Sequence, residues 1–405
     1  MREYTTNGID RRTMLKLTGG VGIAGLAGCS GSSGDEAYNI GMVDAQTGSL
    51  SAFGERNQRG KDLALSAVNE VGIGGSELQV TVEDSGSENQ GGISAAQKLV
   101  NQDGVPFLIG AVGSGVSLAI YESVVEGTDV VQLSQNSTGL GLTDFPELLR
   151  MSPPGSTQAT ALADIIAEDG YDSVALTYVN NNYGQSLAEA FTNAWDGDVA
   201  YNNSHDQEQQ SYSSVISEMN SAGADAWLFI TYQAEFSTMV NEIFSSGYEA
   251  QLYGADSVSG ENVLENTPDG SMEGMKIVVP SAPVEEQNYQ DFASTFEEEY
   301  GQAPTSWAAY AYDCVINAAL AIQAADSFTG AALGEVVRDV SRPEGEQVTS
   351  FEAASDILSD GSPSDVDYQG VSGPIDFDEN GDPVGFLQVL EVQDHSYQGV
   401  DFISS

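Results

Sequence analysis

The sequence predicts an α/β protein made of two successive units, each a parallel sheet with helices on both faces. Short apolar runs that suit buried strands alternate with segments of helical periodicity from residue 38 onward. This alternation pauses at a proline-containing stretch, residues 151–156, restarts after it, and ends in a second such stretch, residues 276–283. A chain of 405 residues is also too long for one ordinary core and suits two.

The first unit opens with a strand and continues as three repeats of helix and strand. Its strands are expected at residues 38–43, 78–82, 105–109 and 130–133, and its helices at residues 60–69, 92–101 and 116–125. Parallel neighbours need a crossover between them, and each helix supplies one. This unit is therefore expected to form a parallel sheet.

The second unit repeats the pattern after the stretch at residues 151–156. Its strands are expected at residues 173–178, 199–201, 226–230 and 251–253, and its helices at residues 159–169, 185–195, 213–222 and 236–246. The remainder is expected to hold helices near residues 289–300, 305–324 and 330–340, and a closing hairpin of residues 373–382 with 385–392.

The charge balance is extreme. The chain has 61 acidic and 12 basic residues, a formal net charge of −49, yet 40% of its residues are hydrophobic and 8% aromatic. Disordered chains lack such apolar content. Because the Debye length falls to about 3 Å at 1 M salt, concentrated salt removes most of the surface repulsion. We expect a folded protein from a halophilic source, with neither nucleic acid nor anionic membrane surfaces as partners.

The N-terminus is typical of an exported lipoprotein. Arg11 and Arg12 precede a short glycine-rich apolar run, too short to span a bilayer, that ends at Cys29. We interpret residues 1–28 as a twin-arginine-type lipoprotein signal peptide, Cys29 as the lipidated residue and residues 29–37 as a flexible tether. The alternative is a frayed terminus with a chance cysteine. The prediction places the protein on the extracellular face of the cell membrane, anchored by lipid.

Several polar or glycine-rich segments follow expected strands in a fixed order. They lie at residues 41–54, 82–84, 108–114, 133–138, 182–184, 232–235, 254–256 and 374–378. No single segment is specific, but their order and spacing together resemble a known family. This family is the branched-chain amino acid type of ABC transporter substrate-binding protein, which belongs to the periplasmic-binding-protein-like class I. The resemblance covers residues 38–405, and with the leader it indicates a haloarchaeal lipoprotein of that type.

The resemblance implies a fold of two doubly wound parallel-sheet lobes joined by three crossovers. Lobe 1 would comprise residues 38–152 and 285–370, and lobe 2 residues 153–284 and 371–405. It also implies an importer receptor that captures a branched-chain or other hydrophobic amino acid by lobe closure. The receptor would deliver this ligand to ABC permease subunits, without cofactor or catalysis.

Three residues are expected to hold the α-carboxylate and α-amino groups of the ligand. By resemblance, the Ser114 hydroxyl and nearby N–H groups bind the carboxylate, while the Asn136 carbonyl and Thr138 hydroxyl contact the amino and carboxyl groups. Ligands of open α/β sheets sit beyond the carboxyl ends of strands, where these residues are expected. The alternatives are that Ser114 is only an N-cap and that Asn136 and Thr138 belong to an ordinary polar turn.

Four more residues complete the expected site. By resemblance, Asp256 pairs with the ligand ammonium at a position where the family often has glutamate, and Phe53, Tyr183 and Tyr232 form the wall around the ligand side chain. Phe53 stands where family members commonly carry tyrosine, so one hydrogen bond is expected to be absent. Alternatively, Asp256 is one of many surface acids and the aromatic residues only pack.

Other chemistries find little support in the sequence. His205 and His395 have no cysteine at metal-ligand spacing, so no metal site is expected. No nucleophile elbow surrounds Ser114, which argues against a hydrolase. Two alternatives stay open beside the amino acid receptor. One is a receptor of the same family for urea or a short amide, and the other is a ligand-sensing module for a membrane signalling partner.

Overall fold

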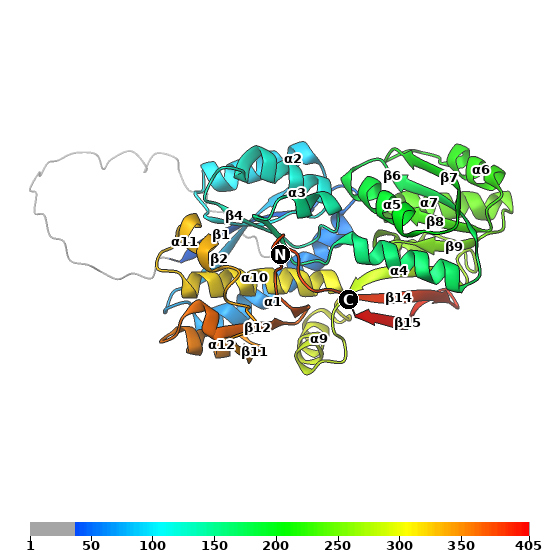
Figure 1. Ribbon diagram of the computed structural model, residues 1–405. Coiled ribbons are helices and arrows are strands. Elements are labelled where there is room, and N and C mark those ends of the chain that lie inside the picture. Colours follow the sequence, from blue (N-terminus) through cyan, green and yellow to red (C-terminus); the bar gives the residue numbers. More distant parts are fainter. Residues whose placement is uncertain (1–36, 405) are drawn as a thin grey trace, which may run out of the picture. The chain divides into compact units, whose positions relative to one another are not determined.

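The computed structural model describes residues 37–404, which belong to one compact unit. The predicted signal peptide, Cys29 and nearly all of the predicted tether lie outside this range. Within it, no helix combines the length and apolar character needed to cross a bilayer. Two large sheets and one small sheet organise the unit (Figure 1).

A five-stranded, wholly parallel sheet has the strand order β2-β1-β3-β4-β5. Its strands are β1 (Tyr38–Asp44), β2 (Leu78–Asp84), β3 (Phe107–Gly110), β4 (Val131–Ser134) and β5 (Leu148–Arg150). The segments that connect them contain α1 (Ser51–Val71), α2 (Asn89–Asn101), α3 (Ser114–Ile120), the π-helical turn η1 (Tyr121–Val125) and the 3-10 turn η2 (Leu140–Asp144). β3 and β4 are buried along their whole length, as strands covered on both faces must be.

The seven-stranded sheet has the order β15-β14-β10-β9-β8-β6-β7, with β14 and β15 antiparallel to the rest. Its strands are β6 (Ser173–Val179), β7 (Asp198–His205), β8 (Ala226–Ile230), β9 (Gln251–Gly254), β10 (Lys276–Ser281), β14 (Phe386–Gln393) and β15 (Ser396–Ser404). Its helices are α4 (Gly155–Glu168), α5 (Asn182–Ala194), α6 (Ser213–Ala222), α7 (Gln233–Ser246), η3 (Asp256–Val258) and α8 (Glu261–Glu265).

The chain passes between the two large sheets three times: between β5 and α4, after β10, and between β13 and β14. After the second passage come α9 (Gln287–Tyr300), α10 (Ser306–Ala324), α11 (Gly330–Val336), α12 (Phe351–Leu358), η4 (Pro363–Asp365) and the small sheet of β11 (Glu346–Val348), β12 (Val366–Gly370) and β13 (Gly373–Pro374). α10 packs against α1 beside the five-stranded sheet (Figure 1). The predicted α/β class with parallel sheets is confirmed.

Three expectations about individual elements are wrong. The closing hairpin does not pair residues 373–382 with 385–392, because β14 pairs with β15 instead. Residues 276–281 form strand β10 rather than part of a crossover. Helix α1 begins at Ser51, nine residues before the predicted start, because its first turns are largely polar and carry too little apolar periodicity to be recognised.

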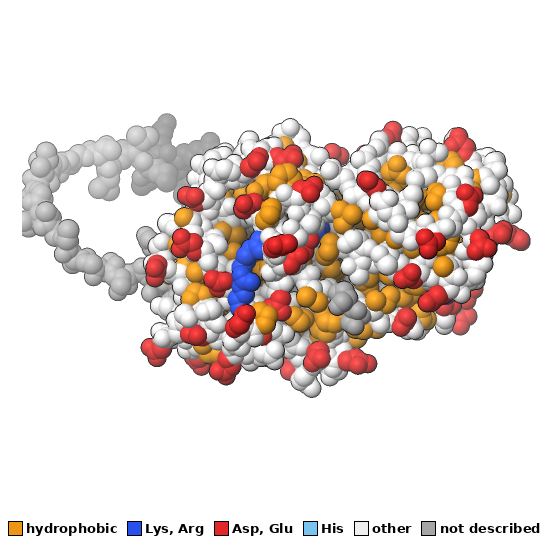
Figure 2. All heavy atoms as spheres, viewed as in Figure 1, with side chains coloured by type: hydrophobic (Ala, Val, Ile, Leu, Met, Phe, Trp, Pro, Cys, Tyr) orange, Lys and Arg blue, Asp and Glu red, His pale blue; other side chains and the backbone are white. Residues whose placement is uncertain are grey.

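The described part of the chain is strongly acidic at its surface. Figure 2 shows Asp and Glu side chains spread over the visible face, with only a small group of basic side chains. Four of the 12 basic residues precede residue 37, which leaves eight in the described range. Most of these eight are engaged in ion pairs, such as Lys98 with Glu83 and Lys276 with Asp169.

Candidate functional site

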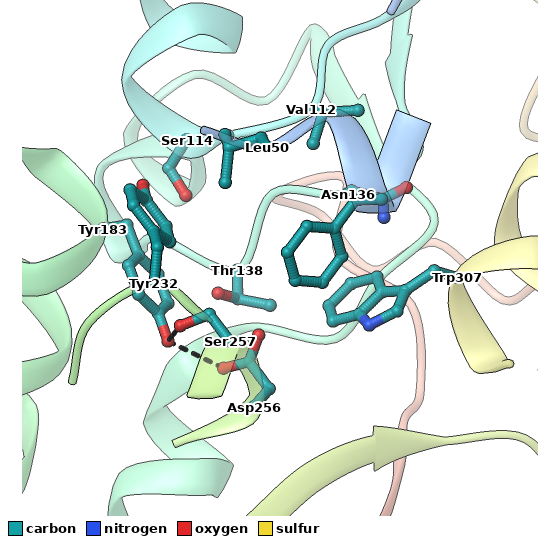
Figure 3. Close-up of a pocket in the computed structure, with 12 residues that line it drawn as sticks. Leu50, Val112, Ser114, Asn136, Thr138, Tyr183, Tyr232, Asp256, Ser257 and Trp307 are labelled. Carbon is teal, nitrogen blue, oxygen red and sulfur yellow. Dashed lines mark hydrogen bonds between the residues drawn. The ribbon is translucent and has the colours of Figure 1, made fainter. Parts of the chain in front are cut away.

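The carboxyl ends of strands from both large sheets meet around one cavity. The five-stranded sheet contributes the segments that follow β1, β3 and β4, and the seven-stranded sheet those that follow β6, β8 and β9. The empty space among the lining atoms is about 340 Å³, a figure that includes space open to solvent. Its lining comprises Leu50, Phe53, Val112, Gly113, Ser114, Asn136, Thr138, Tyr183, Tyr232, Asp256, Ser257 and Trp307. All seven residues that the sequence singled out for ligand binding are therefore in one place (Figure 3).

Ser114 and Thr138 lie on two neighbouring loops that are joined to each other. The N–H of Gly139 donates to Ser114 Oγ over 2.9 Å, and the N–H of Gly113 donates to the Asn136 carbonyl over 3.0 Å. Ser114 is the first residue of α3, whose N-cap is Gly113 and has no side-chain cap bond. The simple N-cap alternative for Ser114 is therefore wrong. The Val116 N–H in the first turn of α3 already donates to the Gly113 carbonyl. The other N–H groups at the start of a helix have no acceptor within it, so they can serve a bound carboxylate.

Asp256 follows β9 and is the single ionisable carboxylate of the lining. Its side chain is 4% exposed, and Oδ1 accepts from Gln158 Nε2 and from the Tyr183 hydroxyl, each over 2.9 Å. Burial raises the pKa of Asp256 above its ordinary value, although the two donors act in the opposite direction. The alternative of a solvated surface acid is wrong. This carboxylate is buried, held in place and without a basic partner in the lining.

Two aromatic pairs contribute to the cavity wall. Tyr183 and Tyr232 stack with ring centroids 5.7 Å apart, and Asn181 Nδ2 donates to the Tyr232 hydroxyl over 2.9 Å. Phe53 meets Trp307 edge to face, also at 5.7 Å. Burial, followed by the charge of Asp256, raises the pKa of Tyr183 well above its usual value, so its hydroxyl keeps the proton it donates. The first pair comes from the seven-stranded sheet, and the second from α1 and α10.

Asn136, whose carbonyl is expected to contact the ligand, lines the cavity. Its carbonyl is already paired with the N–H of Gly113, although a carbonyl oxygen has a second lone pair. Both polar atoms of its side-chain amide are buried without a partner. An unpaired buried amide costs about 1–3 kcal/mol, so this side chain is a place where a ligand group or a water would be stabilised.

Several lining residues are not among those predicted from the sequence, and Trp307 is the largest of them. Trp307 is the second residue of α10, a helix that is apolar nearly all round, so periodicity gives no indication of which side chain reaches a cavity. Leu50 and Val112 lie within the segments 41–54 and 108–114, and Ser257 directly follows the segment 254–256, so the motifs point to all three. No His or Cys lines the cavity, and the described range contains no cluster of potential metal ligands.

Comparison with known proteins gives a consistent result. A model of the family described as periplasmic binding protein matches residues 37–395. A "Leu/Ile/Val-binding protein homolog 3" of Brucella melitensis is 28% identical over 228 residues, which cover 54% of this chain and 61% of that protein. "Leu/Ile/Val-binding protein BraC3" of Rhizobium johnstonii is 26% identical over 54% of this chain and 61% of its own. The chain thus spans about three fifths of the length of these relatives.

Solved structures show the same fold. A leucine binding protein, LivK, of Thermotoga maritima superposes with a TM-score of 0.79 at 22% identity, covering 91% of this chain and 99% of that one. LivJ of Streptococcus pneumoniae in complex with isoleucine gives 0.78 at 21% identity, with 91% and 100% covered. A solute binding protein of R. palustris in complex with benzoate gives 0.74 at 16% identity, with 91% and 97% covered. All three neighbours are named as binding proteins.

Proposed function

Because the chain belongs to the periplasmic binding protein family, we propose that it captures a branched-chain or other hydrophobic amino acid and presents it to the permease of an ABC importer. The observation that carries the proposal is the Asp256 carboxylate. It lies buried in a largely apolar cavity without a basic residue in the lining. A ligand ammonium group would pair with this carboxylate, and the ligand's own carboxylate would be held by neutral donors elsewhere in the lining.

Electrostatics favours a zwitterion over an anion. A bound ammonium would pair with Asp256, and a charge-assisted hydrogen bond of this kind is stronger than a neutral one. The ligand carboxylate would meet the Ser114 and Thr138 hydroxyls and nearby N–H groups, which are neutral donors. A simple anion such as benzoate would instead add a second negative charge beside Asp256, and a buried unpaired charge is costly.

The apolar wall favours a hydrophobic side chain on the ligand. Leu50, Phe53, Val112 and Trp307 come from segments of the five-stranded sheet and its covering helix, and they offer carbon surface to the cavity. Burial of an aliphatic group against such surface is worth about 0.8 kcal/mol per methylene. The same residues offer little to a strongly polar side chain.

Closure of two lobes would provide the mechanism. In the proposed division, residues 38–152 with 285–370 move as one lobe and residues 153–284 with 371–405 as the other. A ligand held first by Ser114 and Thr138 gains Tyr183, Tyr232 and Asp256 only in the closed state. That difference in contacts would shift the equilibrium toward closure, which the permease could read. Export, lipidation of Cys29 and a working environment of concentrated salt belong to the same proposal.

The test is ligand binding by the wild type and by two aspartate variants. Thermal unfolding in multimolar KCl is followed with the twenty amino acids, benzoate, urea and acetamide, and dissociation constants are measured by calorimetry. A ligand at 100 times its dissociation constant should add about 2.7 kcal/mol of stability. We expect L-leucine, L-isoleucine or L-valine to act. Asp256→Asn should weaken binding about 30-fold or more, because the ammonium loses its charged partner.

Asp326→Asn is the matched control, because Asp326 is exposed. It should bind like the wild type. Stabilisation by benzoate or urea alone, or equal affinities of the two variants, would contradict the proposal.

A further inference from the structure

A fully buried arginine lies behind the cavity. Arg150 ends β5, is 0% exposed and is not part of the cavity lining. Its Nε donates to Asp382 Oδ1 over 2.6 Å, and Nη2 donates to Thr143 Oγ1 over 2.6 Å. Nη1 donates to the carbonyl oxygens of Ser137 and Gly139 over 3.2 and 2.8 Å. The guanidinium thus binds the main chain on both sides of Thr138.

The segment that Arg150 binds, residues 137–139, carries one of the two ligand-binding hydroxyl groups of the proposed site, that of Thr138, and supports the other, that of Ser114. Thr138 lines the cavity, and the Gly139 N–H holds Ser114 Oγ. The Thr138 carbonyl accepts from the N–H of Gly155 over 2.7 Å. A shift of this segment would therefore move Thr138 directly and Ser114 through one hydrogen bond.

The other side of the network reaches the chain segments that join the two large sheets. Asp382 lies between β13 and β14, in the third passage, and its Oδ2 accepts from Thr143 Oγ1 over 2.9 Å. The Arg150 N–H donates to the carbonyl of Gly381 in the same passage over 3.2 Å. Gly155, which binds the Thr138 carbonyl, begins α4 at the end of the first passage. The Thr138 segment is thus tied to two of the three connections.

Only arginine meets these demands at once. Its planar guanidinium presents five N–H donors in a fixed fork, whereas lysine has a compact ammonium that cannot span two carbonyls and a carboxylate with the same geometry. A buried ion pair of this kind is weak evidence for stability by itself, because desolvation offsets much of the attraction. What this ion pair contributes here is a fixed orientation of the guanidinium, and with it a fixed position of the carbonyl groups that the guanidinium binds.

We propose that Arg150 is a positioning residue for ligand binding. It fixes the position of residues 137–139 relative to the first and third connections between the sheets. This inference rests on the proposed function, because it takes Ser114 and Thr138 as ligand-binding residues. Movement of the connections on lobe closure would be transmitted through Asp382 and Arg150 to the loop that contacts the ligand.

The experiment compares Arg150→Lys with Arg338→Lys in the full chain. Arg338 is a fitting control because it donates to the carbonyl of Asp378, in the same third connection, over 2.5 Å and to the carbonyl of Pro146, whereas residues 137–139 are not among these acceptors. With L-leucine as probe, Arg150→Lys should raise the dissociation constant about ten-fold or more, and Arg338→Lys by less than about two-fold. Wild-type affinity in a folded Arg150→Lys protein, even with a lower unfolding midpoint, would make Arg150 merely structural and overturn the proposal.

A ligand-free measurement separates this inference from the proposed function. Amide hydrogen exchange of Ser137 and Gly139, whose N–H groups donate to Ser152 and Ser114, should be more than ten-fold faster in Arg150→Lys and unchanged in Arg338→Lys. Unchanged exchange in both variants would overturn the inference. A wild type that binds no amino acid would instead contradict the proposed function. If Arg150→Lys does not fold, Thr143→Val removes one acceptor of the guanidinium and should give the same two effects at about three-fold or more.

Discussion

Single residues of the seven-stranded sheet show how burial controls charge in this acidic protein. His205 ends β7 at 5% exposure, with Nδ1 2.9 Å from the Thr177 hydroxyl and Nε2 2.8 Å from the Thr231 hydroxyl. Both partners are neutral. Burial lowers the pKa of His205 to about 4, against a weaker opposite effect of Asp206. The imidazole is therefore neutral in the folded protein at moderately acid pH.

We expect His205 to make the protein less stable as the pH falls. Its pKa is lower in the folded protein than the usual 6.5 of the unfolded chain, so the unfolded chain takes up the proton first. Its stabilising contribution is complete above pH 6.5 and is lost as the pH falls to about 4, a loss of about 3 kcal/mol. Urea unfolding in concentrated KCl between pH 4 and 7.5 measures this loss.

The variant His205→Gln provides the comparison, because it lacks the titrating ring. Other groups titrate in the same range, and buried Asp313, with its pKa raised to about 6, acts in the opposite direction. Its contribution is present at low pH and is lost as the pH rises through 6. The difference between wild type and variant isolates His205, and a difference that does not change with pH would contradict the assignment.

At the scale of elements, the contact of α1 with α10 supports one wall of the cavity. A Cβ placed on Gly60 would lie 2.0 Å from the carbonyl oxygen of Ala308, so the two helix backbones touch at that point. Phe53 lies on α1 and Trp307 on α10, next to this contact, and their rings meet edge to face. Because main-chain atoms cannot yield as a flexible side chain does, glycine is required here.

Gly60→Ala should therefore force the two helices apart. Overpacking of this kind costs about 1–3 kcal/mol of unfolding free energy, and it should also weaken amino acid binding by displacing Phe53 from Trp307. Chemical unfolding and calorimetry measure the two effects.

Gly334→Ala, in helix α11, is the control for the Gly60 variant. A Cβ there would lie 3.7 Å from Val131 Cγ2, an ordinary contact, and alanine should stabilise the helix by about 0.5–1 kcal/mol. Equal effects of the two substitutions would contradict a tight helix contact at Gly60.

At the scale of the whole molecule, the net charge of −49 dominates. Eight basic residues in the described range cannot neutralise the acidic surface seen in Figure 2. Like charges on a compact surface repel one another over about 10 Å at 0.1 M salt but only about 3 Å at 1 M. The folded state is therefore expected to depend on salt far more than that of a balanced protein.

We expect the unfolding midpoint to rise by several degrees between about 0.1 and 1 M KCl, because screening relieves this repulsion. Thermal unfolding followed by circular dichroism measures the rise. Sucrose at the same osmolality is the control, since it is excluded from the surface but does not screen charge. An unfolding midpoint that does not change with KCl, or that rises equally with sucrose, would contradict the salt-dependence part of the proposal.

Much of the fold could be predicted because strands buried on both faces read as continuous apolar runs. Residues 226–230 and 213–222 form a strand and a helix with the bounds that the sequence predicts. The pairing and the bounds of other elements were predicted less well. β14 and β15 are joined by a two-residue turn, Asp394 and His395, whose φ angles are both positive. This turn has no glycine to indicate it. The first turns of α1 are largely polar, although they carry Phe53 into the cavity lining.

By itself the sequence determined the α/β class, the acidic surface and the residues that follow strand ends, including Ser114, Thr138 and Asp256. Only the tertiary structure decided which side chains share one cavity, because Trp307 comes from a helix, α10, that is apolar nearly all round and shows no preferred face. It also decided that Arg150 binds both sides of Thr138 while pairing with Asp382, 232 residues further along the chain. Such long-range contacts have no local signature, since they form only when the connecting segments meet in the folded chain.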